Sequence, residues 1–167
     1  MAAQTGYING SDLLLSIGGK AVGHCSSHKV TFNSETKDRA VKPAMNQGTS
    51  AGLWKEKGVT GLSISISAEG LRFYDETEGG FTEISNLWGA GTSVEVKAFP
   101  RADGTTSKQV PYLVGKFVIT SIEESAAAQD DATYSVSLEN DGEPDTYPGK
   151  TTTSSTSSAQ SGAAVKA

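Results

Sequence analysis

The stretch Gly61–Glu69, GLSISISAE, alternates apolar residues with serine. Successive side chains of a strand point to opposite faces of a sheet, so the pattern predicts a strand with two unlike faces. Its apolar side chains, from Leu62 to Ala68, are expected to enter a core. Its other face carries small, neutral hydroxyl groups, which would form a smooth wall rather than a catalytic pocket. The residues of this second face are Ser63, Ser65 and Ser67.

The composition agrees with a single β-rich domain. The chain has 167 residues, enough to bury a core, and is 36% hydrophobic and 7% aromatic with 19 glycines. These values are more typical of a turn-rich β protein with polar ends than of a compact enzyme. We therefore expect a mainly β fold.

Charge and cysteine content exclude several classes of protein. A formal net charge of −5 argues against a protein that binds nucleic acid tightly through its backbone, because phosphate binding depends on clustered lysine and arginine. The single cysteine excludes an internal disulfide and agrees with a reducing compartment. No apolar run approaches the roughly 18 residues of a membrane helix, and the first residues do not read as a signal peptide. We expect a protein that is made in a cytoplasm and has no membrane partner.

Further strands are expected on both sides of the serine strand. Gly18-Gly19 lies between two short runs, which predicts a tight β-hairpin over residues 12–25. A strand is expected at about residues 27–34, with Thr31 and Asn33 on its polar face. Later alternating runs bring the total to roughly six to eight strands.

One short helix is predicted at about residues 82–90. Apolar residues recur there at helical spacing, so we expect them all to pack on the sheet. Thr82 is a candidate N-cap, and Gly89 or Gly91 a candidate end. The apolar residues of the helix are Phe81, Ile84, Leu87 and Trp88.

The chain divides into a β domain and two arms. Residues 1–10 are small and polar and are expected to form an N-terminal arm, and residues 11–142 the domain. Residues 143–167 form a C-terminal arm or tail, rich in serine and threonine, whose composition cannot build its own core. Within the domain, residues 35–59 are predicted to be a long loop, and loops of that length are usually functional or disordered.

No group of residues indicates catalysis or a cofactor. His24, Cys25 and His28 are close in sequence, but strand positions four apart are separated by roughly 13 Å, and alternate side chains point to opposite faces. We therefore expect no metal there and interpret Cys25 as a small buried core residue. The acidic pairs Glu123-Glu124 and Asp130-Asp131 are interpreted as solvated turn residues, because the spacing of a calcium loop is absent. We expect no enzyme, metal or cofactor.

Several short motifs follow one another along the chain: GSDLLL at Gly10–Leu15, HKVTF at His28–Phe32, LWKE at Leu53–Glu56, LWGAGT at Leu87–Thr92, GKFVITSI at Gly115–Ile122 and DDATYSVSLE at Asp130–Glu139. Their order and spacing over about residues 6–142 resemble those of the major tail tube proteins of long-tailed, siphovirus-type bacteriophages. The segment after residue 142 departs from the common pattern of that family.

The resemblance implies a β-sandwich or barrel-like tail tube fold with one flanking helix. It implies hexameric rings that stack into a hollow tube, through which DNA passes from capsid to host. The long loop would contact neighbouring subunits and rings, and one polar sheet face would line the lumen. The candidate contact residues are Lys37, Asp38, Arg39, Lys42, Met45, Leu53 and Trp54; the candidate lumen residues are Thr31, Asn33, Ser63, Ser65 and Ser67.

The same resemblance implies the partners and the location. The subunit would bind copies of itself, with a tape measure protein inside the tube and terminator and distal tail proteins at its ends. Double-stranded DNA would pass through without specific binding. The protein would belong to the virion tail and be assembled in the host bacterial cytoplasm, with no membrane partner.

Two other functions remain open from the sequence. A tube subunit of a contractile injection system would share the fold. A carbohydrate-binding β-sandwich would use Trp54, and less readily Trp88, as a platform for a sugar. Glycan binding by an isolated monomer would favour the carbohydrate-binding module.

Overall fold

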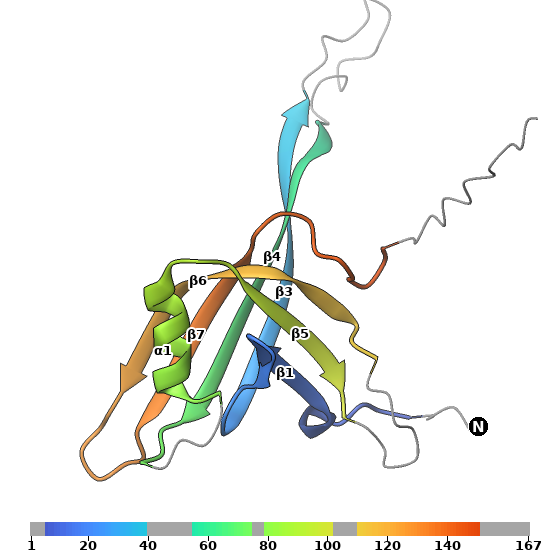
Figure 1. Ribbon diagram of the computed structural model, residues 1–167. Helices are drawn as coiled ribbons and strands as arrows, with labels where there is room; N and C mark the ends of the chain where they lie inside the picture. Colours follow the sequence, from blue (N-terminus) through green and yellow to red (C-terminus); the bar gives the residue numbers. More distant parts are fainter. Residues whose placement is uncertain (1–5, 40–54, 75–78, 102–109, 151–167) are drawn as a thin grey trace, which may run out of the picture.

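A computed structural model describes residues 6–39, 55–74, 79–101 and 110–150 of the chain (Figure 1). Within these ranges the fold is mainly β with one short α-helix, α1 (Phe81–Ala90), as predicted, and a 3-10 turn (Gly10–Asp12). No helix in this described part is long and apolar enough to cross a membrane. The strands are β1 (Leu13–Ile17), β2 (Lys20–Ala21), β3 (Cys25–Arg39), β4 (Glu56–Leu71), β5 (Val94–Pro100), β6 (Leu113–Ser125) and β7 (Thr133–Asn140).

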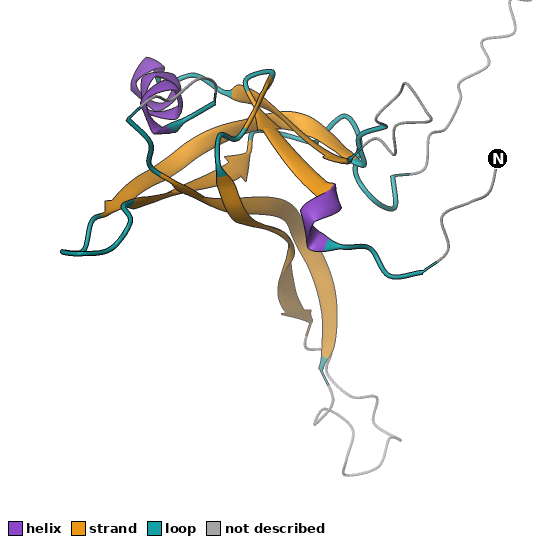
Figure 2. Cartoon of the chain, turned by 90° about the horizontal axis from the view of Figure 1, so that it is seen from below, coloured by secondary structure: helices purple, strands orange, loops and turns teal. Residues whose placement is uncertain are grey.

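The strands form one open, curved, antiparallel sheet in the order β2-β1-β5-β6-β7-β4-β3. The predicted hairpin is present: Ile17 pairs with Lys20, and the two intervening glycines have φ values of 63° and 85°. Such positive φ values suit the tight turns that join neighbouring strands. Figure 2 shows that α1 covers one face of this sheet.

The core lies on the face that α1 covers. Ile66, Val136 and Leu138 are almost fully buried there, and Ile84 of α1 packs against this cluster. Leu62, which we expected in the core, is instead 72% exposed, because it lies beyond Ser65, the last residue of β4 that pairs with β7. Along β4, the buried apolar side chains therefore end at Ile64, although the alternation in the sequence continues to Leu62.

Both ends of α1 depend on glycine. Gly80 is the N-cap in place of the predicted Thr82, and Gly91, with φ of 65°, ends the helix as predicted. The Glu83 carboxylate accepts hydrogen bonds from the Gly79 amide at 2.8 Å and from the Lys20 ammonium at 2.7 Å. The Lys20 bond, more than the Gly79 bond, holds the pKa of Glu83 below its ordinary value. These contacts join the start of the helix to β2.

Trp88 is 56% exposed, so its predicted place in the core is wrong. The helix has only ten residues, and its packing centres on Ile84. Trp88 lies in the last turn, beyond that buried residue, where a large indole ring is only partly covered.

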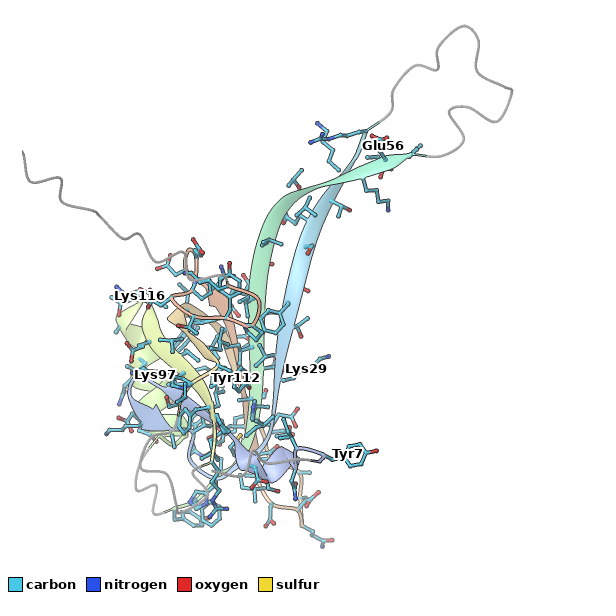
Figure 3. All side chains as sticks on the ribbon, turned by 90° about the vertical axis from the view of Figure 1, so that its right-hand side faces the viewer. Tyr7, Lys29, Glu56, Lys97, Tyr112 and Lys116 are labelled. Carbon is cyan, nitrogen blue, oxygen red and sulfur yellow. The ribbon has the colours of Figure 1, made fainter. Side chains whose placement is uncertain are left out.

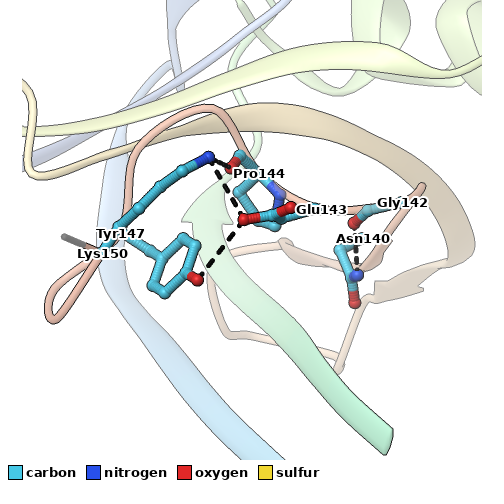
Figure 4. A network of polar contacts seen from close by, with 6 residues as sticks. All are labelled: Asn140, Gly142, Glu143, Pro144, Tyr147 and Lys150. Carbon is cyan, nitrogen blue, oxygen red and sulfur yellow. Dashed lines mark hydrogen bonds and ion pairs between the residues drawn. The ribbon is translucent and has the colours of Figure 1, made fainter. Parts of the chain in front are cut away.

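The chain after β7 folds back onto the sheet. The Asp141 amide donates to the carbonyl of Lys116, and Val114 and Thr146 exchange two backbone hydrogen bonds of 3.0 Å. The Lys150 ammonium donates to the carbonyl oxygen of Pro144 at 2.9 Å and lies 3.3 Å from Glu143 (Figure 4). Residues 143–150, which we assigned to the C-terminal arm, thus pack against β6; residues 151–167 lie outside the described ranges.

A pair of glycine substitutions tests this packing. A Cβ at Gly79, where φ is 63°, would collide with the carbonyl oxygen of Ala21, so Gly79→Ala should lower the free energy of unfolding by at least about 2 kcal/mol. Gly89 in α1 has open space around it, so Gly89→Ala should raise that free energy by about 0.5 kcal/mol. Urea denaturation measures both. Equal effects from the two variants would contradict the described contact between residue 79 and β2.

Candidate assembly and lumen surfaces

The predicted polar residues lie together on the sheet face opposite the core. In the register of β3 and β4, Thr31 pairs with Ser65, and Asn33 pairs with Ser63. Asn33 also donates from its side-chain amide to the Ser65 hydroxyl at 3.1 Å. Ser67 follows on the same face, paired with Lys29. The structure therefore brings all five candidate lumen residues onto one surface, which we name the hydroxyl face.

The hydroxyl face continues across strands that our candidate list did not include. Ser137 of β7 pairs with Ser67 on one side and with Ser121 of β6 on the other. The alternation of β7, with Tyr134 and Val136 buried, was the signal that could have identified these serines. The additional members of the face are Ser121, Ser135, Ser137 and Glu139.

Acidic groups flank the serines of this face. Glu69 and Glu123 both pair with Ser135, and Glu139 pairs with Ser65. On the same side of the sheet, Lys29 of β3, Lys97 of β5 and Lys116 of β6 are opposed by these three glutamates and by Glu95. The face thus combines small hydroxyl groups with a net negative charge, which repels phosphate and offers little for it to bind.

β3 is the terminal strand of the described sheet, and its 15 residues leave one side without a neighbouring strand. At the opposite edge, β2 has only two residues. An edge strand presents backbone N–H and C=O groups that can pair with another chain. A long edge at one side of the sheet and a short one at the other suit a head-to-tail contact between copies.

β3 and β4 continue past the rest of the sheet as a two-stranded hairpin, seen in Figures 1 and 3. The pairing of β4 with β7 ends at Ser65 and Glu139, and the Ile64 amide then donates to the Asn140 side chain at 2.8 Å. Beyond this point β3 and β4 pair only with each other, as far as Arg39 and Glu56. We name this part, residues 34–39 and 56–62, the projecting hairpin.

The long loop predicted over residues 35–59 is in part the projecting hairpin. Residues 35–39 and 56–59 are strand, so the segment between the strands is shorter than the expected residues 35–59. Lys37, Asp38 and Arg39 are exposed residues of β3, and Asp38 lies 3.9 Å from the Lys55 ammonium. The other candidate contact residues, Lys42, Met45, Leu53 and Trp54, lie outside the described residues.

The His24–His28 segment holds no metal cluster, in the part of the chain that the structure describes. His24 stacks on Phe73 with ring centroids 3.7 Å apart. Cys25 is exposed rather than buried, because it lies at the irregular start of β3, where the pairing with β4 shifts register. Partial desolvation raises the pKa of its thiol, and burial lowers the pKa of His28.

The sequence model described as "Phage tail tube protein" matches residues 8–146, which include the whole described sheet. The chain belongs to the phage tail tube protein family. It is a tail tube subunit of phage-like particles, and the predicted resemblance is confirmed. None of the curated proteins compared with the chain matches it.

Solved tail tubes share the fold of this tail tube protein. A chain in the tail of a gene transfer agent particle, described with C6 symmetry, is 20% identical with a TM-score of 0.60, over 83% of this chain and 97% of that one. The SPP1 tail tube is 16% identical with a TM-score of 0.53, over 83% and 78%. A chain of the sheath–tube complex of an extracellular contractile injection system is 14% identical with a TM-score of 0.54, over 81% and 88%.

A test of the hairpin's attachment uses two asparagines. Asn140→Ala removes the acceptor for the Ile64 amide and a donor to the Gly142 carbonyl, so it should lower the free energy of unfolding by about 1–2 kcal/mol. Hydrogen exchange at the Ile64 amide should become faster. Asn33→Ala removes an exposed hydrogen bond of 3.1 Å and should change stability by less than about 0.5 kcal/mol. Unchanged protection of Ile64 in Asn140→Ala would contradict the described junction.

Proposed function

We propose that this tail tube protein assembles with copies of itself into rings that stack into a hollow tube, and that the tube conducts DNA from capsid to host. The observation that carries the proposal is the 15-residue free edge of β3, directly beside the hydroxyl face. We infer rings of six because a chain of the same fold occurs in a tail with C6 symmetry. The role is structural and needs no catalysis or cofactor.

Ring closure follows from the two unlike edges of the sheet. If β3 of one copy pairs beside β1 and β2 of the next, the same contact repeats around the ring until it closes. Each sheet then continues into its neighbour, and no long strand edge is left exposed. The hydroxyl face would form a continuous inner wall, and α1 would lie outside it.

The inner wall would let DNA move because its lysines are outnumbered by glutamates and it offers phosphate few groups to bind. Serine side chains are short and uncharged, and the glutamates at positions 69, 123 and 139 repel the backbone. Lysines are the exception on this side of the sheet: Lys29 lies beside Ser67, and Lys97 and Lys116 both lie next to Glu95, which forms an ion pair with Lys97 at 2.7 Å. DNA would therefore slide without specific contacts.

Other tail components would bind the ends and the interior of the tube. Chains of the same fold occur in a sheath/tube terminator and in a tube terminating cap of injection systems. By analogy, terminator and distal tail proteins would cap this tube, and a tape measure protein would occupy its lumen before DNA does. Assembly would take place in the cytoplasm of the host bacterium.

Electron microscopy of the purified protein tests the assembly. We expect rings or tubes of repeating subunits, with a six-fold axis along an open channel, as in the tail described with C6 symmetry. A protein that remains monomeric at high concentration, and is absent from the tails of the particle, would overturn the proposal. DNA inside the assembled tails of the particle would separate a DNA-conducting tail from an injection system.

Charge substitutions test the role of the hydroxyl face. Ser67→Lys places a second cation beside Lys29, so tails carrying it should assemble but release DNA at least about threefold more slowly at low salt. High salt should remove most of the difference, because it screens the added charge. DNA release from particles, followed by a dye, is the measurement.

Two controls accompany this substitution. Ser67→Glu has a similar size but the opposite charge, and Asn86→Lys places the same cation on α1, away from the hydroxyl face. Neither should slow release. Slowing by Asn86→Lys as large as that by Ser67→Lys would show that the hydroxyl face does not line the channel.

A further inference from the structure

An apolar groove lies where the projecting hairpin leaves the sheet. Its volume is about 360 Å³; one wall comes from β3 and β4 at residues 32–34 and 62–64, where the hairpin begins, and the other comes from the segment after β7. On the hairpin side, Phe32 is 52% exposed and Leu62 72% exposed. We name it the hairpin groove; its main lining residues are Phe32, Leu62, Ile64, Pro144 and Tyr147.

The wall opposite the hairpin is held in place by polar contacts. Lys150 donates to the Pro144 carbonyl and pairs with Glu143, and the Tyr147 hydroxyl lies 3.5 Å from the same carboxylate (Figure 4). Glu143 is the charged residue among those lining the groove, and Lys150 balances its charge. The groove is therefore a formed, largely apolar surface with little net charge, which suits an uncharged apolar partner.

A segment of matching chemistry lies near the other end of the molecule. Tyr7 and Ile8 are exposed, and Tyr7 extends away from the body of the protein (Figure 3). No charged residue occurs from Gly6 to Ser11. In Figure 3, Tyr7 and the tip of the hairpin, marked by Glu56, lie toward opposite ends of the molecule. One copy thus presents an apolar segment at one end and an apolar groove toward the other.

We propose that Tyr7 and Ile8 of one copy bind in the hairpin groove of the next copy along the tube. The inference rests on the proposed tube function and identifies one contact by which rings stack. The contact is heterologous, because the segment and the groove are different surfaces, and it repeats along an axis without closing. The stack therefore extends into a filament with a defined direction.

The area involved agrees with a contact that works only in an assembly. A tyrosine buries about 150–250 Å² of surface, and the isoleucine adds less. The total is well below the roughly 800 Å² per partner of a stable pair of proteins. Isolated copies should therefore not pair through the groove. Two rings that make several such contacts at once should bind each other much more tightly than two single copies do.

Disulfide cross-linking tests the contact directly. In a Cys25→Ser background, which removes the one native thiol, Tyr7→Cys combined with Leu62→Cys should give ladders of covalently linked subunits when assembled tubes are oxidised. The matched control is Tyr74→Cys with Leu62→Cys, because Tyr74 is an equally exposed tyrosine just after the opposite end of β4. The control should give at most a tenth of the linked product. Tubes that form without the Tyr7–Leu62 link, or that link both pairs equally, overturn the inference.

A charge exchange gives a second measurement that does not depend on disulfides. Tyr7→Lys and Leu62→Glu should each raise the critical concentration for tube formation about tenfold, the effect of losing an interface anchor. The double variant should recover most of that loss, because the lysine then meets the glutamate. No effect of the single variants, or no recovery in the double variant, overturns the inference. Failure of the unsubstituted protein to form tubes contradicts instead the proposed function itself.

Discussion

The structure depends on one constraint, which is that β4 is much longer than its inner neighbour. β4 has 16 residues and pairs with β3 over nearly its whole length, whereas β7 has eight residues and pairs only with the half of β4 nearest Leu71. The unmatched half of β4 must leave the sheet together with β3. The projecting hairpin, the hairpin groove and the exposed position of Leu62 all follow from this difference in length.

The two-residue period of the strands separates the core from the hydroxyl face. In β4, Ile64, Ile66 and Ala68 are buried, while Ser63 and Ser67 between and beside them are exposed. The same separation continues in β7, where Val136 is buried and Ser137 faces the other side. A slip of one residue in register would place serines in the core and isoleucines on the outer face. Stability and the chemistry of the proposed channel are thus fixed by the same alternation.

The surfaces proposed for assembly are places where intramolecular packing ends. In the described sheet β3 has no further strand beside it, and Phe32 and Leu62 lack the cover that α1 and the core strands give to the buried apolar residues. A monomeric protein usually protects long strand edges and avoids large apolar patches. In a tube subunit these features are complementary surfaces for other copies, with the long edge serving the ring and the groove serving the stack.

Local features explain which elements could be predicted from the sequence. Gly18-Gly19 specified a hairpin, and Gly91 specified the end of α1, because each depends on a backbone conformation that glycine adopts readily. The residues around Lys37 were predicted to be loop because a hairpin with no core on either face shows no apolar alternation. Cys25 and Trp88 were wrongly expected to be buried, because Cys25 lies at the irregular start of β3 and Trp88 in the last turn of α1, where the packing of each element ends.

The sequence by itself determined the β class and the two faces of the serine strand, because alternation and glycine positions are local properties, and the order of its motifs indicated the family. Tertiary structure alone decided that β7 stops at Asn140, that residues 143–150 return to β6, and that Leu62 remains uncovered. Those facts depend on pairing between segments far apart in the chain. Strand ends in a sheet are set by the partner's length as much as by the strand's own residues.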